Sequence, residues 1–351
     1  ILQIMLKKYI SFFIISICAL VFSCAPRPSF DAVKVLFDEL ARSEEHFFGN
    51  NWKAFDALEC AFDRDPDERR AFGLFSTFYF ATTEQSFDEV SHIDIRAMVE
   101  YMGNLLESTP EGGIIIVGGR DNYRLARFAS ATKPSFRSVA VINIDFIPDV
   151  RYRRHISRKH GIEIPDEVAQ RIIGDVHPKL LWDIMLDWFV SSSGRDVYLG
   201  MDLPAMGGRK SYFVGQGRLY TESLTDEEHK ELVLRLFSEG YSYEHCNSGW
   251  GKFSEKANSM VQTYGEGLVY TAGGWFTEGD TASAESLAIV AFERLPHHWQ
   301  PVNLRFVMES DPSPELLDTL IARLDTFTAK FPRNRQAVAL LNRLRERRES
   351  G

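Results

Sequence analysis

Cysteine and histidine are scarce in this chain, and the spacings that usually carry metal or nucleophile chemistry are missing. Four cysteines and nine histidines occur in 351 residues, without any H-E-x-x-H, C-x-x-C or G-x-S-x-G pattern. These absences argue against zincin-type proteases, paired-cysteine centres and serine hydrolases with a nucleophile elbow. His297 and His298 are adjacent, so on a helix they would point about 100° apart and make a poor pair of ligands. We therefore predict no metal site and no cofactor.

Basic charge is also limited. The chain has 49 acidic residues against 40 lysines and arginines, and its formal net charge is -9. Proteins that bind nucleic acid need a basic face to neutralise phosphates, so we expect no nucleic-acid partner. Removal of residues 1–23, which contain two lysines and no acid, would make the remainder still more acidic.

Long apolar runs are absent after the first 23 residues. The run from Tyr9 to Phe22 follows two lysines and is short for a membrane span, which is typical of a secretory signal. It ends in the sequence VFSC, which resembles a bacterial lipobox. We predict that residues 1–23 are a lipoprotein signal peptide, that Cys24 is lipidated, and that residues 24–30 tether the protein to membrane lipid. This would place it in the bacterial cell envelope, facing the periplasm; the alternative is a signal anchor or an ordinary signal with an incidental cysteine.

Two cysteines, Cys60 and Cys246, lie beyond the signal and the lipobox. In an oxidising periplasm they can pair, but the sequence does not give the distance between them. Two buried free thiols are the alternative.

One spacing of small residues occurs twice. A glycine is followed by alanine at plus five, alanine at plus twelve and proline at plus seventeen, at Gly279, Ala284, Ala291 and Pro296, and at Gly49, Ala54, Ala61 and Pro66. This spacing resembles the second half of a tetratricopeptide repeat. The glycine would lie in the tight turn between two helices, the alanines where the helices approach closely, and the proline after the second helix. The alternative is two unrelated amphipathic hairpins.

The C-terminal occurrence of this spacing has the clearer first helix. Leu268, Ala272 and Trp275 precede Gly279 at intervals of four and three, which places them on one helical face. The tail adds two further amphipathic helices, separated at Pro332. Stacked helical hairpins of this kind commonly bind peptides or proteins.

The middle of the chain has a different periodicity. Short apolar runs bounded by turn residues predict strands at 113–117, 138–145 and 196–201, with an edge strand at 217–222. Helical patterns at 123–132, 166–173 and 178–190 lie between them. This alternation predicts a small, mainly parallel α/β layer, with ligands at the carboxyl ends of its strands.

The predicted fold class is α/β plus all-α, in which tetratricopeptide-like helical hairpins flank the α/β layer. We divide the chain after the tether into an N-terminal helical region at 31–108, an α/β domain at 109–225, and a tetratricopeptide-like helical domain at 226–351.

The glycine-rich stretch GGIIIVGGRDNYRLARF, residues 112–128, raises the question of a phosphate-binding turn. It matches neither G-x-G-x-x-G nor the P-loop pattern G-x-x-x-x-G-K-[ST]. A carboxylate at Asp121 would itself occupy the positive end of the following helix. We therefore predict that Asp121 or Asn122 caps this helix and that the glycines allow a sharp turn.

A family resemblance runs through the same stretch. Its order is an apolar strand, a glycine, an aspartate, an aromatic residue, a helix, the pattern V-x-N and a tyrosine nine residues later, at Gly118, Asp121, Tyr123, Asn143 and Tyr152. This order is similar to the soluble C-terminal region of a bacterial protein O-mannosyltransferase-like membrane protein family. The segments RDVYLGMDLP and GQGRLYTES resemble later parts of that region. The similarity covers roughly residues 100–350 and lacks the membrane half, and Gly119 stands where the family usually has a second acid.

In that family the sugar-transfer chemistry is expected in the membrane half, so the resemblance implies a detached accessory domain. We expect a non-enzymatic binding or scaffold module for protein or glycan. The alternative is a carbohydrate-active envelope enzyme related to glycosyl transfer, with catalytic groups at the strand ends: Asp121, Asn143, Asp145 and Tyr152.

The candidate ligand-binding residues are Arg120, Asp121, Tyr123 and Arg151. Arg151 begins a basic cluster that continues through Arg153, Arg154, Arg158 and Lys159. This cluster either binds an anionic ligand or forms a solvated helix face that pairs with nearby acids.

Overall fold

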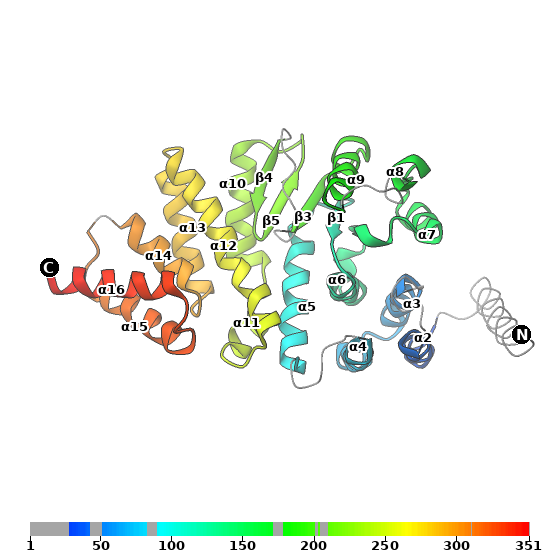
Figure 1. Ribbon diagram of the computed structural model, residues 1–351, viewed down its shortest axis with the longest axis horizontal. Helices are drawn as coiled ribbons and strands as arrows, with labels where there is room; N and C mark the ends of the chain where they lie inside the picture. The colour runs from blue at the N-terminus through cyan, green and yellow to red at the C-terminus, as the bar shows by residue number, and fades with distance from the viewer. Residues whose placement is uncertain are drawn as a thin grey trace, which may run out of the picture. The chain divides into compact units, whose positions relative to one another are not determined.

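The computed structural model describes residues 28–42, 51–82, 90–170, 178–200, 203, 210–309 and 311–350. Cys24, the signal segment and Gly49 lie outside these residues. The chain divides into two compact units, Ile1–Phe78 and Tyr79–Gly351 (Figure 1), each of which is described by itself. The sequence patterns place a boundary at residue 108, whereas here the helix before that residue belongs to the larger unit.

The smaller unit is helical. It contains α2 (Phe30–Arg42), α3 (Asn51–Arg64) and the greater part of α4 (Glu68–Thr82). Phe37 stacks on Phe78 with ring centroids 4.5 Å apart, and Phe55 meets Phe37 edge to face at 5.7 Å. Ala54 and Ala61 are buried on α3, as expected for small residues at a close helix contact.

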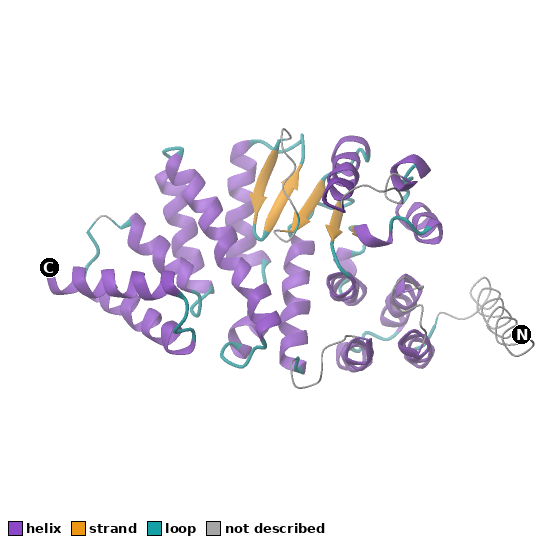
Figure 2. Cartoon of the chain, viewed as in Figure 1, coloured by secondary structure: helices purple, strands orange, loops and turns teal. Residues whose placement is uncertain are grey.

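The sheet of the larger unit is mixed. Its strands are β1 (Ile114–Val117), β2 (Ala140–Asn143), β3 (Val197–Gly200), β4 (Ser211–Val214) and β5 (Gly217–Tyr220). They lie in the order β2-β1-β3-β5-β4, and Figure 2 shows β1, β3, β5 and β4 side by side. β1 pairs in parallel with β2 and β3, whereas β5 pairs antiparallel with β3 and β4. The prediction of a mainly parallel layer is therefore wrong, because a β4–β5 hairpin extends the parallel strands.

The position of β5 also differs from the prediction. The sequence places an edge strand at 217–222, but β5 lies between β3 and β4, and β4 forms that edge of the sheet. β4 has only four residues, which alternate between half-buried and buried. A pattern this short is hard to recognise without its partner strand.

Helices connect the parallel strands. α6 (Arg120–Thr132) and the short η2 (Pro134–Phe136) join β1 to β2. The segment after β2 contains η3 (Ile144–Phe146), α7 (Val150–His160), α8 (Asp166–Gln170) and α9 (Pro178–Ser192). α6 and α7 both contact β2. The helices predicted at 123–132, 166–173 and 178–190 correspond to α6, α8 and α9, residues 171–173 lie outside the described ones, and α7 was not predicted.

Helix α5 (His92–Glu107) ties the sheet region to the C-terminal helices through buried acids. One Asp94 carboxylate oxygen accepts the backbone N–H of Ser254 at 2.7 Å. The Glu100 carboxylate accepts the backbone N–H groups of His245 and Cys246 at 3.0 and 2.9 Å. Because buried carboxylates are costly without such partners, these bonds hold the segment before α12 against α5.

Cys246 is a free, buried thiol in the part of the chain that the structure describes. Cys60 lies on α3 of the smaller unit, so the pairing of these two cysteines stays a prediction. Burial, with Glu100 nearby, raises the pKa of the Cys246 thiol, which is typical of an unreactive core cysteine.

The C-terminal part is a series of helices: α10 (Asp226–Arg235), the π-helical η4 (Leu236–Gly240), α11 (Glu244–Gly249), α12 (Glu255–Thr277), α13 (Thr281–Arg294), α14 (Trp299–Met308), α15 (Pro314–Lys330) and α16 (Arg335–Ser350). Gly279 adopts a φ of 90° between α12 and α13, which confirms its predicted place in the turn. Ala284 and Ala291 are buried on α13. Pro332 lies between α15 and α16, as expected.

Helix α12 packs against the β4–β5 hairpin through a glycine. A Cβ atom at Gly267 would overlap the carbonyl oxygen of Gly215, in the hairpin turn. Figure 1 shows α10 and α12 beside the β4 end of the sheet, and both helices contact β4. Among the described residues, no helix is both long and apolar enough to cross a membrane.

Candidate functional site

The predicted site at the strand ends begins with the turn after β1. Register pairs Val117 with Asn143 across β1 and β2, so the residues just beyond both strands meet. The backbone N–H of Gly119 donates to the Asp145 carboxylate at 2.8 Å, and the Asn143 amide donates to the Gly119 carbonyl at 2.9 Å. Asp145 thus places a carboxylate where an anion would bind at the start of α6.

Asp121 does not cap α6, and neither does Asn122, so that prediction is wrong. Gly119 is the N-cap residue, with a φ of 74° and no side-chain capping bond. Asp121 and Asn122 lie inside the first turn of α6, and the carboxylate that binds at its start comes from Asp145 on the neighbouring segment. The capping prediction fails because a residue distant in sequence supplies the acceptor.

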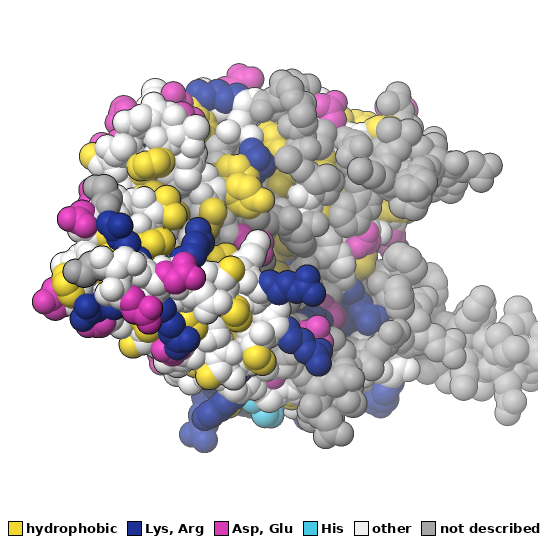
Figure 3. Space-filling view, turned by 60° about the vertical axis from the view of Figure 1, so that its left-hand side comes forward, with side chains coloured by type: hydrophobic (Ala, Val, Ile, Leu, Met, Phe, Trp, Pro, Cys, Tyr) yellow, Lys and Arg dark blue, Asp and Glu magenta, His cyan; other side chains and the backbone are white. Residues whose placement is uncertain are grey.

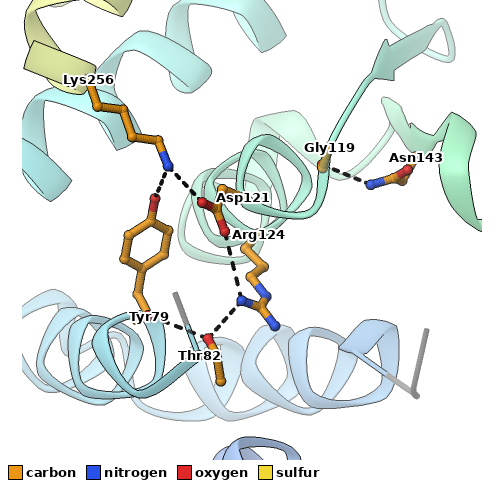
Figure 4. A network of polar contacts seen from close by, with 7 residues as sticks. All are labelled: Tyr79, Thr82, Gly119, Asp121, Arg124, Asn143 and Lys256. Carbon is orange, nitrogen blue, oxygen red and sulfur yellow. Dashed lines mark hydrogen bonds and ion pairs between the residues drawn. The ribbon is translucent and has the colours of Figure 1, made fainter. Parts of the chain in front are cut away.

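The Asp121 carboxylate instead joins a polar network (Figure 4). Lys256 Nζ on α12 donates to Asp121 at 2.6 Å and to the Tyr79 hydroxyl at 3.3 Å. Arg124 donates to the Thr82 hydroxyl at 2.7 Å and lies 3.9 Å from the other Asp121 oxygen. Only the Lys256–Asp121 pair reaches solvent, with side chains 26% and 25% exposed.

Burial dominates the electrostatics of this network. It lowers the pKa of Arg124 to about 9, with repulsion from Arg120 adding to the effect and Asp121 opposing it. Burial and the charge of Asp121 raise the pKa of Tyr79 far above its ordinary value. At neutral pH Arg124 is therefore charged and Tyr79 protonated, so Tyr79 is unsuited to act as a general base.

Tyr152 and Tyr123 are core residues. The Tyr152 hydroxyl accepts the backbone N–H of Asn143 at 2.9 Å, and its ring meets those of Phe146 and Tyr123 edge to face at 5.5 and 6.2 Å. Both tyrosines are buried, and burial raises the pKa of Tyr152 well above its ordinary value. These two predicted site residues therefore belong to the core that supports the end of β2.

Two arginines of the basic cluster on α7 pair with nearby acids. Exposed Arg151 bonds to Asp149, the N-cap of α7, at 2.9 Å. Burial acts to raise the pKa of Asp149, but hydrogen bonds from Arg151 outweigh it and hold that pKa below its ordinary value. Arg153 is buried, donates to the Ile147 carbonyl at 2.8 Å and bonds to Asp166 at 2.5 Å. Both arginines thus have structural partners.

The four alternative catalytic residues do not form one constellation. Asp121 faces Lys256, while Asn143 and Asp145 hold Gly119 and Tyr152 lies in the core. Of the candidate ligand residues, Arg120 is half-buried at the start of α6. Within the described ranges, no three histidine, cysteine, aspartate or glutamate side chains gather as ligands for a metal ion.

The sequence interpretation missed a groove on the C-terminal helices. It has a volume of about 590 Å³ and lies between α15 and the segments that follow α11 and α13. Its lining residues are Trp250, Pro296, His297, Asp318, Thr319, Ala322, Arg323, Thr326 and Phe327. The rings of Trp250 and His297 stack, with centroids 4.5 Å apart and planes 12° apart. One sequence signal was available, the small and polar residues at 319, 322 and 326 on one face of α15.

Two cations border this groove. The Arg323 guanidinium lies 3.5 Å from the Phe292 ring centroid and donates to the Phe292 carbonyl. Lys330 Nζ lies 5.3 Å from the Trp250 ring centroid. Burial lowers the pKa of both cations, and burial together with Arg323 lowers the pKa of His297.

The surface seen in Figure 3 mixes basic and acidic side chains and carries no broad patch of one sign. Local charges therefore decide what this surface can bind.

Comparison of the chain with models of known families, with curated proteins and with solved structures gives no match.

Proposed function

We propose that this protein is a lipid-anchored, non-enzymatic binding or scaffold module of the bacterial cell envelope, and that its partner is a protein or glycan. The observation that carries the proposal is that the polar groups at the strand ends and the open groove lie in different places. The groups at the strand ends make internal hydrogen bonds, whereas the groove lies on the C-terminal helices. Clefts with a mainly apolar lining and a few polar groups are the usual form of binding sites.

The helical part supports this proposal. The α12–α13 hairpin, with Gly279 in its turn and Ala284 and Ala291 buried, has the features expected of a tetratricopeptide-like unit. We propose that residues 226–351 form a domain of this type. Such stacks act through surfaces formed by neighbouring helices, and the groove lies at such a place.

The resemblance to the soluble region of the O-mannosyltransferase-like family belongs to the same proposal. In this view Gly118, Asp121 and Tyr123 mark a shared structural element and carry no reaction. A carbohydrate-active enzyme would need an acid and a base on either side of one bound substrate. The hydrogen bonds that Asn143 and Asp145 make to Gly119 argue for support of the turn.

Site-specific photo-crosslinking in cells tests the binding function. A benzophenone side chain replaces Thr326, which lines the groove and is exposed, or Asn342, an exposed residue of α16 outside the lining. We expect adducts to envelope protein or glycan from position 326 and none from 342. Their loss in Cys24→Ala would show that the anchor is needed to meet the partner.

The opposite outcome is equally clear. Equal labelling from both positions, or none from either, would count against the groove as a binding site. Adducts formed only from a probe at position 121, together with a glycosyl-transfer product whose formation Asp145→Asn abolishes, would favour the enzymatic alternative.

A further inference from the structure

We infer that the groove beside α15 binds an acidic peptide segment, whose carboxylates meet Arg323 and Lys330 and whose apolar side chains meet Trp250 and Phe327. This inference rests on the proposed binding function and names the chemistry of the partner.

The first reason is the distribution of charge around α15. Two of its acids pair with α16: Asp318, which also lines the groove, bonds to Arg348 at 2.8 Å, and Asp325 bonds to Arg345 at 2.6 Å. Arg323 and Lys330 form no ion pair with any residue that the structure describes. The charge of Glu293 acts on Arg323, but the two side chains form no ion pair. In a chain with more acids than bases, two cations that lack an ion-pair partner beside a groove provide charge complementarity for an anionic partner.

The second reason is the surroundings of these cations. Arg323 lies over the ring of Phe292, and Lys330 lies over the ring of Trp250. Burial lowers both pKa values, and it is the only influence resolved for Lys330. A cation held in partly dry, aromatic surroundings binds a carboxylate more strongly than one in open water.

The third reason is spacing. Arg323 and Lys330 are seven residues apart on one helix, about 10 Å along its axis. Alternate residues of an extended peptide share one face, and residues i and i+2 or i and i+4 lie about 7 or 13 Å apart, so acids at alternate positions can reach both cations. Phe327 lies between the cations. The hydroxyls of exposed Thr319 and Thr326 donate to carbonyls of their own helix, so their oxygens can accept peptide N–H groups.

A glycan is less well matched to the same groove. Sugar rings bind proteins by stacking on open aromatic faces, whereas His297 already stacks on Trp250 and Lys330 lies over the same indole. Arg323 likewise covers Phe292. These covered ring faces argue against a flat sugar ring as the ligand.

Fluorescence anisotropy with the purified full chain in detergent tests this assignment. The probes are the fluorescein-labelled, end-blocked peptides DFELDF and NFQLNF, which differ only in their three charges. We expect DFELDF to bind about tenfold or more tightly than NFQLNF, and added sodium chloride to reduce the difference. Equal affinities for the two peptides would overturn the assignment.

Matched variants locate the site. Arg323→Gln with Lys330→Gln should remove the preference for DFELDF. Arg235→Gln with Arg343→Gln removes the same charge at exposed positions outside the lining and should leave the preference intact. Lys330→Gln alone, at a half-exposed residue, should weaken DFELDF severalfold and guards against misfolding of the double variant. Equal losses in the groove and control pairs would overturn the assignment.

The result also separates this inference from the proposed function. If neither peptide binds at millimolar concentration while position 326 still forms specific adducts in cells, the acidic peptide is wrong and the binding function stands. The same conclusion follows if an acidic oligosaccharide such as oligogalacturonate binds in the groove more tightly than DFELDF. If neither peptide binds and position 326 forms no adducts, the acidic-peptide assignment and the proposed function are both rejected.

Discussion

The backbone N–H of Gly119 donates a 2.8 Å hydrogen bond to the carboxylate of Asp145. This bond joins the ends of two parallel strands and supplies a negative charge at the start of α6. It explains how a glycine-rich turn that resembles a nucleotide-binding turn can be a structural joint. An anion bound there would have to displace Asp145.

Asp145→Ala should therefore reduce the stability of the fold, because we expect Asp145 to have a structural role and no catalytic one. We expect a loss of about 1–3 kcal/mol in the free energy of unfolding, because the Gly119 N–H loses its acceptor and the helix start its charge. Asp145→Asn keeps an acceptor oxygen and should lose less. Urea unfolding measures the difference, with exposed Glu163→Ala as the charge-matched control. A loss no larger than that of the control would contradict this role.

The ion pair between Lys256 and Asp121 should contribute more than an ordinary surface pair. Both side chains are about three-quarters buried, so screening by water is reduced. A double-mutant cycle with Lys256→Met and Asp121→Asn should give a coupling energy of about 1 kcal/mol. The same cycle for Lys34 and Asp38, which are 59% and 38% exposed, should give close to zero. Equal coupling in the two cycles would show that the network adds nothing.

The sequence predicted the elements that have local signals. β1 was expected at 113–117 and lies at 114–117, and the α15–α16 break falls at Pro332 as expected. The place of Gly279 is predicted correctly because a tight turn between helices requires a positive φ, which glycine adopts without steric cost. Such features depend on neighbours in the chain.

The features that the sequence could not give depend on partners far along the chain. Asp121 was expected to cap its own helix, but its partner is Lys256, 135 residues away. The antiparallel half of the sheet depends on β4, whose four residues become a strand through pairing with β5. The groove brings Trp250 to α15, which no periodicity within either segment indicates.

His298 should make stability fall as the pH falls from about 6.5 to about 4. Burial, together with the neighbouring His297, lowers the pKa of His298 from 6.5 to about 4. Between these values the unfolded chain takes up a proton that the folded chain does not, so unfolding becomes easier as acid is added. The loss should approach roughly 3 kcal/mol. Chemical unfolding at a series of pH values in this range gives the free energy of unfolding as a function of pH. This free energy should change less steeply with pH in His298→Gln than in the parent chain, and equally steeply in the exposed control His92→Gln. Identical slopes in all three proteins would reject this assignment.

Two glycines of α12 should respond in opposite directions to the same substitution. A Cβ atom at Gly267 would overlap the backbone carbonyl of Gly215, and backbone in a hairpin turn cannot move aside cheaply. Gly267→Ala should therefore lower the free energy of unfolding by about 1–3 kcal/mol. At Gly273 a Cβ atom would have no atom within 4 Å, so Gly273→Ala should raise it by about 0.5–1 kcal/mol, because alanine restricts the unfolded chain and favours the helix. Thermal unfolding of the two variants beside the parent chain compares them directly. Stabilisation by Gly267→Ala would mean that α12 and the β4–β5 hairpin do not pack as closely as the structure shows.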